Sequence, residues 1–216
     1  MIINEGKYYT GNAYLSLEQM QVNATFIYNY YLEKGWTAFA ICGMLGNMQR
    51  ESTINPGIWQ DLDQYQNQQN GYGLVQWTPA TKYLDWCFEN SLESRKMESN
   101  LARIDYELAN GLQWISTSTY PMTFKEFISS TQSPSYLASV FLHNYERAGV
   151  SAESERQQNA NYWYKYLTGN TPPSGGDDPE LPDLPITPGV SKKRKGYNFV
   201  LFGASKKRLR GILWVD

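Results

Sequence analysis

Residues 37–57 of this 216-residue chain read TAFAICGMLGNMQRESTINPG, a pattern typical of a buried helix that ends in a polar turn. Thr37 is a favourable N-cap, and Met44, Met48 and Glu51 then fall on one helix face. At the end of an apolar stripe, Glu51 is partly removed from water, which favours the protonated form that a general acid needs. The structural alternative is that Glu51 pairs with a neighbouring cation or caps a backbone amide.

Apolar stripes of the same kind predict seven helices, so residues 1–168 form a mainly helical, α or α+β, domain. Ser16 with Gln19 and Thr123 with Glu126 are capping boxes. The stripes run through Met20–Tyr31, Ile41–Met48, Tyr83–Cys87, Met97–Leu108, the short segment after Thr123, Leu137–Tyr145 and Ala160–Leu167. Thr78 followed by Pro79 predicts the start of the third helix. Residues 53–77 are polar and irregular, with room for a short hairpin.

The composition is that of a globular protein, with 41% hydrophobic and 19% charged residues. No apolar run reaches the roughly 20 residues of a membrane span, and the N-terminus lacks the pattern of a signal peptide. Two cysteines and one histidine argue against a disulfide scaffold and against a zinc site. We therefore expect no metal and no cofactor, and chemistry based on carboxylates.

The C-terminal part differs from the domain in both composition and charge. Six of the ten prolines fall in residues 169–190, which predicts an extended linker. Residues 191–216 carry eight basic side chains and one acidic one, a net charge of +7, whereas the preceding residues carry −9. Two apolar runs around a basic turn in this tail predict a hairpin that binds an acidic or anionic partner. A solvated end is the alternative.

A second motif, GYGLVQWTPAT at residues 71–81, supplies groups that suit a glycan. Gly73 permits a tight backbone beside a groove, Gln76 can hydrogen-bond a sugar, and Tyr72 and Trp77 offer flat faces to a pyranose. Aromatic residues make up 15% of the chain, and we expect some of them to contact substrate and others to pack in the core. Trp59, Tyr65, Tyr72 and Trp77 are expected to stack on sugars, and Trp36, Trp86, Trp114 and Trp163 to pack in the core.

A Glu-Ser pair followed by Gly-Leu-Val-Gln resembles the lysozyme superfamily, above all goose-type lysozymes and soluble lytic transglycosylases. Residues 145–149 are similar to the Tyr-Asn-Ala-Gly element of those transglycosylases, from which Glu146 and Arg147 depart. The narrower resemblance, carried by residues 40–57 and 73–80, is to the tail-associated lysozyme domain of short-tailed phages that infect Gram-positive bacteria. It extends over roughly residues 14–168.

The resemblance implies a lysozyme-like α+β fold and an enzyme that cleaves peptidoglycan between N-acetylmuramic acid and N-acetylglucosamine. Glu51 matches the catalytic glutamate. The resemblance also implies a place in the virion tail, with tail-tip or knob proteins as partners through residues 191–216. Nucleic acid is not expected as a partner, and neither is a metal-dependent peptidase activity. A late-acting endolysin and a catalytically weak structural component of the tail tip are the alternatives.

The sequence does not decide which residue provides the second carboxylate of such an enzyme. Asp61 and Asp63 follow Glu51 in the polar loop, and either can position a water or remain a solvated acid. Glu146 is a third candidate, and with Tyr145 and Trp59 it is also expected to contact substrate. Without a second carboxylate, assistance by the substrate N-acetyl group would give lytic transglycosylation instead of hydrolysis.

Overall fold

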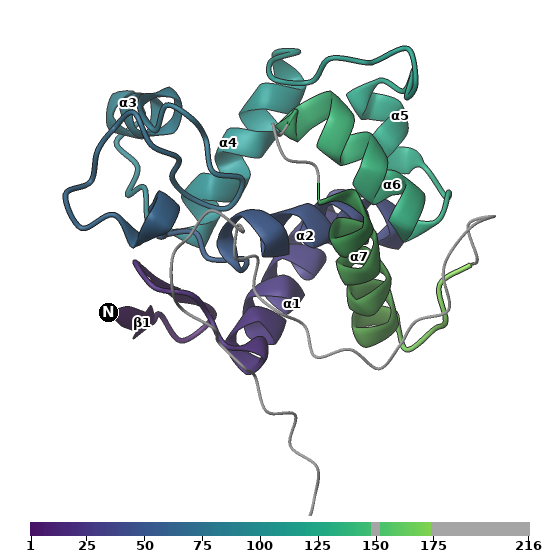
Figure 1. The fold of residues 1–216 in the computed structure, drawn as a ribbon, viewed down its shortest axis with the longest axis horizontal. Helices are drawn as coiled ribbons and strands as arrows, with labels where there is room; N and C mark the ends of the chain where they lie inside the picture. Colours follow the sequence, from purple (N-terminus) through teal and green to yellow (C-terminus); the bar gives the residue numbers. More distant parts are fainter. Residues whose placement is uncertain (148–151, 174–216) are drawn as a thin grey trace, which may run out of the picture.

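Seven α-helices and one two-stranded sheet make up the part of the chain that this computed structural model describes, residues 1–147 and 152–173 (Figure 1). The elements are β1 Ile2–Asn4, β2 Tyr9–Gly11, α1 Leu17–Glu33, α2 Ala38–Ser52, α3 Thr81–Glu89, α4 Met97–Ala109, α5 Phe124–Ser129, α6 Pro134–Phe141 and α7 Glu153–Thr168. A short 3-10 turn spans Gln60–Leu62, and a π-helical turn spans Leu142–Glu146. The predicted mainly helical fold is therefore confirmed.

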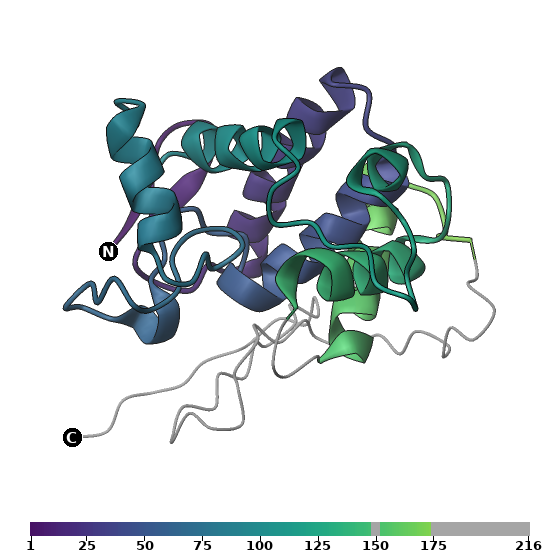
Figure 2. The same ribbon diagram turned by 90° about the horizontal axis from the view of Figure 1, so that it is seen from above.

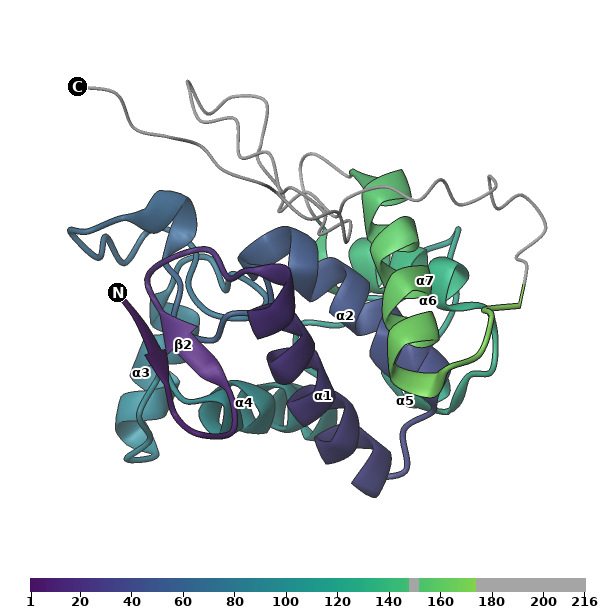
Figure 3. The same cartoon turned by 90° about the horizontal axis from the view of Figure 1, so that it is seen from below.

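Helix α2 is the central element of this arrangement. It packs against α7 and α6, and on another side against α1. Figures 2 and 3 show β1, β2, α3 and α4 gathered on one side of α2, with α5, α6 and α7 on the other. Gly43 and Gly46 make this packing close, because a Cβ added at Gly43 would lie 2.8 Å from the Leu137 side chain. At Gly46 an added Cβ would lie 2.4 Å from the carbonyl oxygen of Arg156.

Most helix starts coincide with the predicted caps. Ser16 and Gln19 form a capping box at α1, and Thr123 and Glu126 form another at α5. The Thr37 side chain accepts from the amide of Ala40 at α2. These local signals are correct because a cap side chain satisfies amides that lie only two or three residues away.

Two details differ from the prediction. Helix α3 begins at Thr81 and not directly after Thr78, because the Ala80 amide donates to the carbonyls of Gln68 and Asn70 and holds this segment against the loop. In place of the expected hairpin in residues 53–77, the loop holds two isolated bridges, Trp59 to Tyr72 and Tyr72 to Trp77.

The N-terminal hairpin of β1 and β2 was not expected from the sequence. The strands are antiparallel, with Ile3 opposite Thr10. The side chain of Asn55, just beyond α2, donates to the carbonyls of Gly11 and Ala13 and ties the hairpin to the domain.

Most of the aromatic residues lie in the core or pack against it. Trp36 and Trp163 are buried, and Trp86 and Trp114 pack against the core from its edge, as predicted. Cys42 and Cys87 are buried free thiols. In the described ranges, no helix is both long enough and apolar enough to cross a membrane.

Helix α7 ends at Thr168, and the basic tail with its predicted hairpin lies outside the described residues. The division into domain, linker and tail therefore stays a prediction.

Candidate active site

Glu51 lies in the last turn of α2, directly before Ser52, the last helical residue, and Thr53, the C-cap. Its side chain is 20% exposed, so the carboxylate can meet a bound molecule while the rest of the residue packs against protein. Thr53 takes a left-handed conformation (φ 54°) and its amide donates back to the carbonyls of Gln49 and Met48. This turn leaves the carboxylate of Glu51 at the edge of the domain core.

The Glu51 carboxylate forms an ion pair with the guanidinium of Arg156, in the first turns of α7. The Arg156 side chain is only 2% exposed, and its Nη1 donates to Oδ1 of Asn47 at 3.0 Å. Asn47 in turn donates to the carbonyls of Gly43 and Ala138, so the guanidinium is held by a buried polar chain. The structural alternative for Glu51, a cation partner, is therefore present, together with the partial exposure that a general acid needs.

Arg156 was missed in the sequence analysis, although a signal for it exists. It lies four residues before Ala160 and seven before Trp163, so it shares their buried face of α7. A basic residue on an apolar stripe needs an anionic partner, because an unpaired buried charge is costly. The position of Arg156 on this apolar face thus indicates that it needs a carboxylate partner, but it does not show which carboxylate that is.

Glu146 is a second carboxyl group, and the charge of Glu51 affects its ionisation. It ends the π-helical turn that continues α6, and its Oε1 is buried with no hydrogen-bond partner in the described part of the chain. Burial, and after it the negative charge of Glu51, raise the pKa of Glu146 well above the usual glutamate value. Arg156 acts in the opposite direction. Glu51, Glu146 and Arg156 therefore form one electrostatic unit, which we call the carboxyl pair with its arginine.

Glu107 of α4 is a buried carboxylate whose charge also acts on Glu146. It is 1% exposed and accepts from Nε1 of Trp77 at 3.0 Å and from Nε of Arg103 at 2.9 Å. The hydroxyl of Tyr145 donates to its other oxygen. One buried carboxylate thus joins the loop that carries Gln76 to the turn that carries Glu146.

The second motif lies against the end of α2. Oγ of Ser52 is 2.9 Å from the carbonyl of Met48 and 2.8 Å from that of Leu74, so its hydroxyl bridges the helix and the loop. Gly73 has a φ of +82°, and a Cβ there would come within 2.7 Å of Oδ1 of Asn100. Glycine is therefore required for this close approach.

Gln76 uses part of its side chain to fold this loop. Its Nε2 donates to the carbonyls of Ile58 and Gly73, at 3.2 and 3.0 Å. The side chain is half-buried, which leaves its amide oxygen as the group suited to a substrate hydroxyl or amide.

The aromatic side chains of the loop need a correction. Trp59, Tyr72 and Trp77 were expected to offer open faces to sugars, but their exposed fractions are 7%, 5% and 3%. Trp77 stacks on Tyr83 with ring centroids 4.4 Å apart, so one face of its indole is covered by a core residue, and the whole side chain is buried. Among the four aromatics proposed for stacking, Tyr65 is the open one, at 96% exposure.

Tyr145 is likewise a core residue, at 1% exposure. Its ring stacks on Phe141 and its hydroxyl is used by Glu107, so direct contact with substrate is not supported. Residues 148–149, the end of the motif that contains Tyr145, lie outside the described residues.

Asp61 and Asp63 lie in the polar loop. Asp61 is exposed and has a φ of 57°. Asp63 accepts from the amides of Tyr65 and Asn67, both at 2.9 Å, and from the side chain of Asn70 at 3.0 Å. The amide of Asn67, and then that of Tyr65, lower the pKa of Asp63. Both oxygens of Asp63 therefore stabilise the loop.

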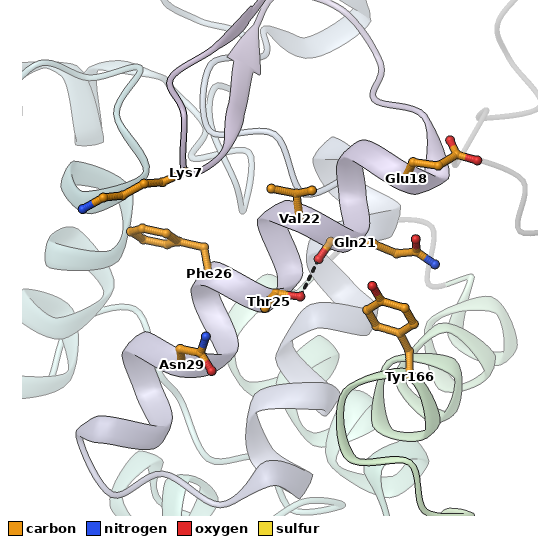
Figure 4. A pocket seen from close by; sticks show the side chains of 8 residues that line it. All are labelled: Lys7, Glu18, Gln21, Val22, Thr25, Phe26, Asn29 and Tyr166. Carbon is orange, nitrogen blue, oxygen red and sulfur yellow. Dashed lines mark hydrogen bonds between the residues drawn. The ribbon is translucent and has the colours of Figure 1, made fainter.

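A shallow groove of about 470 Å³ follows the outer face of α1, between Lys7 and Tyr166 (Figure 4). Phe26 and Val22 form its apolar part. Its lining includes none of the site residues discussed above, so it is separate from the carboxyl pair. Within the described ranges, no three histidine, cysteine or acidic side chains gather in a way that could hold a metal ion.

Comparison with known proteins agrees with the resemblance predicted from the two motifs. The family model for the phage tail lysozyme matches residues 22–167. Morphogenesis protein 1 of Bacillus phage B103 is 56% identical to the chain over 162 residues. The aligned part covers 75% of this chain and 44% of that relative, so the chain spans less than half of the relative's length.

Proposed function

Because this chain belongs to the phage tail lysozyme family, we propose that it is a virion-associated peptidoglycan glycosidase. It cleaves the glycan strand between N-acetylmuramic acid and N-acetylglucosamine and opens the host wall as the phage enters. The observation that carries the proposal is the placement of Glu51, which is partly exposed, paired with a buried arginine and close enough to Glu146 to affect its ionisation.

In the mechanism, Glu51 delivers a proton to the glycosidic oxygen while the bond from that oxygen to the anomeric carbon breaks. The electron pair of the bond stays on the leaving oxygen, and positive charge develops on the sugar ring. General acid catalysis of this kind contributes about 10²–10⁴-fold to the rate. Peptidoglycan is the substrate, and Tyr65 and the amide oxygen of Gln76 are the candidates to contact it.

The second carboxylate remains a choice between Asp61, Asp63 and Glu146. The hydrogen bonds of Asp63 within its own loop favour a structural role for it, and the proximity of Glu146 to Glu51 favours Glu146. Analysis of digested wall fragments by mass spectrometry separates the two reaction outcomes. Reducing muramic acid ends support hydrolysis, whereas anhydro-muramoyl ends support lytic transglycosylation.

Clearing of peptidoglycan in a gel tests the proposal directly. We expect Glu51→Gln to lose clearing by at least about 10²-fold, because the amide cannot donate the proton. Glu89→Gln, at an exposed position near the end of α3, is the matched control and should clear normally. Circular dichroism of all three proteins controls for folding. Full clearing by Glu51→Gln, or no clearing by the wild type, would overturn the assignment.

We extend the proposal to the tail of the virion, with tail-tip or knob proteins as partners of residues 191–216. The support is the phage relative and the +7 charge of this segment. Particles assembled with residues 191–216 deleted should lack the protein. Its presence in such particles would contradict the docking role, and its absence from wild-type particles would favour an endolysin.

A further inference from the structure

Arg156 binds two side chains that lie one helical turn apart on α2. Its Nη1 donates to Oδ1 of Asn47 at 3.0 Å, and its Nη2 donates to Oε1 of Glu51. Positions 47 and 51 are four residues apart and therefore share one face of the helix. A guanidinium is planar and presents its N–H donors in a rigid fork. Because both acceptors belong to the same helix, the two bonds fix the orientation of the guanidinium relative to α2.

The side chain of Asn47 is itself held in one orientation. It is fully buried, and its Nδ2 donates to the carbonyls of Gly43 and Ala138, both at 3.0 Å. These two bonds use both amide hydrogens, so Oδ1 is the atom that faces Arg156. Ala138 belongs to α6, and the anchor of the guanidinium therefore depends on a second helix as well as on α2.

The backbone of α7 lies close to the same turn of α2. A Cβ added at Gly46, the residue before Asn47, would lie 2.4 Å from the carbonyl oxygen of Arg156. The Arg156 side chain is only 2% exposed. A side chain enclosed in so close a contact has few other rotamers available. The guanidinium is thus held both at its own backbone and at its tip.

The two carboxyl oxygens of Glu51 have different surroundings as a result. Oε1 accepts from Arg156, whereas Oε2 has no hydrogen bond within the described ranges. An oxygen that accepts from a cationic donor keeps its lone pairs for that donor, so the proton of the neutral acid belongs on Oε2. The 20% exposure of the side chain lets Glu51 reach a bound molecule.

We propose that Arg156, held in place by Asn47, is a positioning residue for the general acid. It binds Oε1 of Glu51 and thereby aims Oε2 at the glycosidic oxygen. The inference rests on the proposed function of Glu51 and adds which oxygen delivers the proton and what holds it. Arg156 acts through Glu51, because its own side chain is buried.

The step is balanced in protons. The O–H bond at Oε2 of Glu51 breaks as the proton binds the glycosidic oxygen, and the electron pair of the C–O bond stays on that oxygen. Glu51 is then a carboxylate in contact with the guanidinium of Arg156. The water or sugar hydroxyl that captures the anomeric carbon returns one proton to Glu51. A displacement of about 1 Å can cost such a step about 10²-fold in rate, so loss of the anchor should lower kcat and leave KM nearly unchanged.

A second ion pair between α2 and α7 provides a matched control. Nε of Arg50 lies 3.2 Å from Oε2 of Glu155, so this pair joins the same two helices without using the carboxylate of Glu51. Arg50→Met removes a cross-helix ion pair, as Arg156→Met does. If Arg156 had only a structural role, both variants would keep the wild-type kcat per folded molecule.

Steady-state cleavage of soluble peptidoglycan strands gives kcat and KM, and circular dichroism gives the folded fraction. We expect Arg156→Met to lower kcat about 10–100-fold per folded molecule, with KM within about twofold of the wild type. Arg50→Met should keep the wild-type kcat. Arg156→Lys keeps the charge, and it should still lower kcat at least about tenfold, because an ammonium cannot bind both acceptors in the same geometry.

Two results would overturn the proposal. One is a wild-type kcat in Arg156→Lys, which also decides the matter if Arg156→Met does not fold. The other is an equal loss of kcat in Arg50→Met and Arg156→Met, because the effect would then follow from any weakened contact between α2 and α7.

A further measurement depends neither on activity nor on folding of the arginine variants. Nitrogen-15 NMR of arginine side chains compares the wild type with Glu51→Gln. The wild type should give separate Nη1 and Nη2 signals for Arg156, because both groups are bound, and the Nη2 signal should move in Glu51→Gln. An unchanged Arg156 spectrum would overturn the pairing. If Glu51→Gln clears walls normally, the proposed function fails. If it is inactive while Arg156→Lys keeps the wild-type kcat, only the positioning role fails.

Discussion

Glu51 and Arg156 form an ion pair between α2 and α7, although 105 residues separate them in the chain. The pair joins the proposed acid to a helix that supplies the largest packing surface of α2. The chemistry and the stability of the domain therefore depend on the same contact.

Arg156→Met should destabilise the domain. The change leaves the Glu51 carboxylate without its partner and removes the donor to Asn47. Breaking one side of a buried pair costs about 3–5 kcal/mol, and we expect the lower end of this range here because Glu51 is partly exposed. Urea unfolding measures the loss. Arg156→Lys, which keeps the charge and cannot bind both partners in the same geometry, should be intermediate. Wild-type stability of Arg156→Met would contradict the importance of the pair.

Gly46→Ala should destabilise the protein, against the intrinsic preference of a helix for alanine. Propensity alone predicts a gain of about 1 kcal/mol. The added Cβ would lie 2.4 Å from the Arg156 carbonyl and 2.8 Å from the amide nitrogen of Ala160. Overpacking of this kind costs about 1–3 kcal/mol. The sign of the measured change in unfolding free energy therefore shows whether overpacking or helix propensity is the larger effect. Thermal unfolding gives that sign, and a stabilised variant would show that α7 can move away from α2 at little cost.

Local signals were sufficient for much of the fold and for the position of Glu51 in the last turn of α2. The capping residues at α1, α2 and α5 and the spacing of Glu51 from Met48 act over three or four residues, and they can be recognised in one sequence. Contacts between distant segments cannot be recognised in this way. No local sequence pattern shows that Arg156 pairs with Glu51, or that the indole of Trp77 donates to Glu107.

The aromatic residues show the same limit. A tryptophan beside a glycine-rich loop has the same sequence pattern whether it faces a sugar or the core. Trp77 faces the core because the buried carboxylate of Glu107 accepts its indole N–H. Tyr65, twelve residues before Trp77 in the same loop, is exposed, and its ring has no such anchor among the residues that the structure describes.

Glu107→Gln should cost about 2–3 kcal/mol, because the amide supplies one acceptor oxygen where three donors now meet a carboxylate. The indole of Trp77 reports the change by fluorescence, and urea unfolding gives the free energy. Glu89→Gln, exposed and without this network, should change stability by less than about 0.5 kcal/mol. Equal stability of the two variants would argue against Glu107 as a structural link between the loop and Tyr145.

Asp63 predicts a pH response of the polar loop. Its pKa is lowered because the amides of Asn67 and Tyr65 donate to the ionised carboxylate. A lowered folded-state pKa means that these bonds contribute fully above the unfolded aspartate value. Their contribution is lost as the pH falls through the folded value. Amide NMR shifts of Tyr65 and Asn67 should therefore titrate with a midpoint below the usual aspartate pKa of about 3.9. In Asp63→Asn both shifts should be independent of pH in this range. A midpoint at or above the usual value would mean that the carboxylate is free in solution and available for another role, including that of second carboxylate.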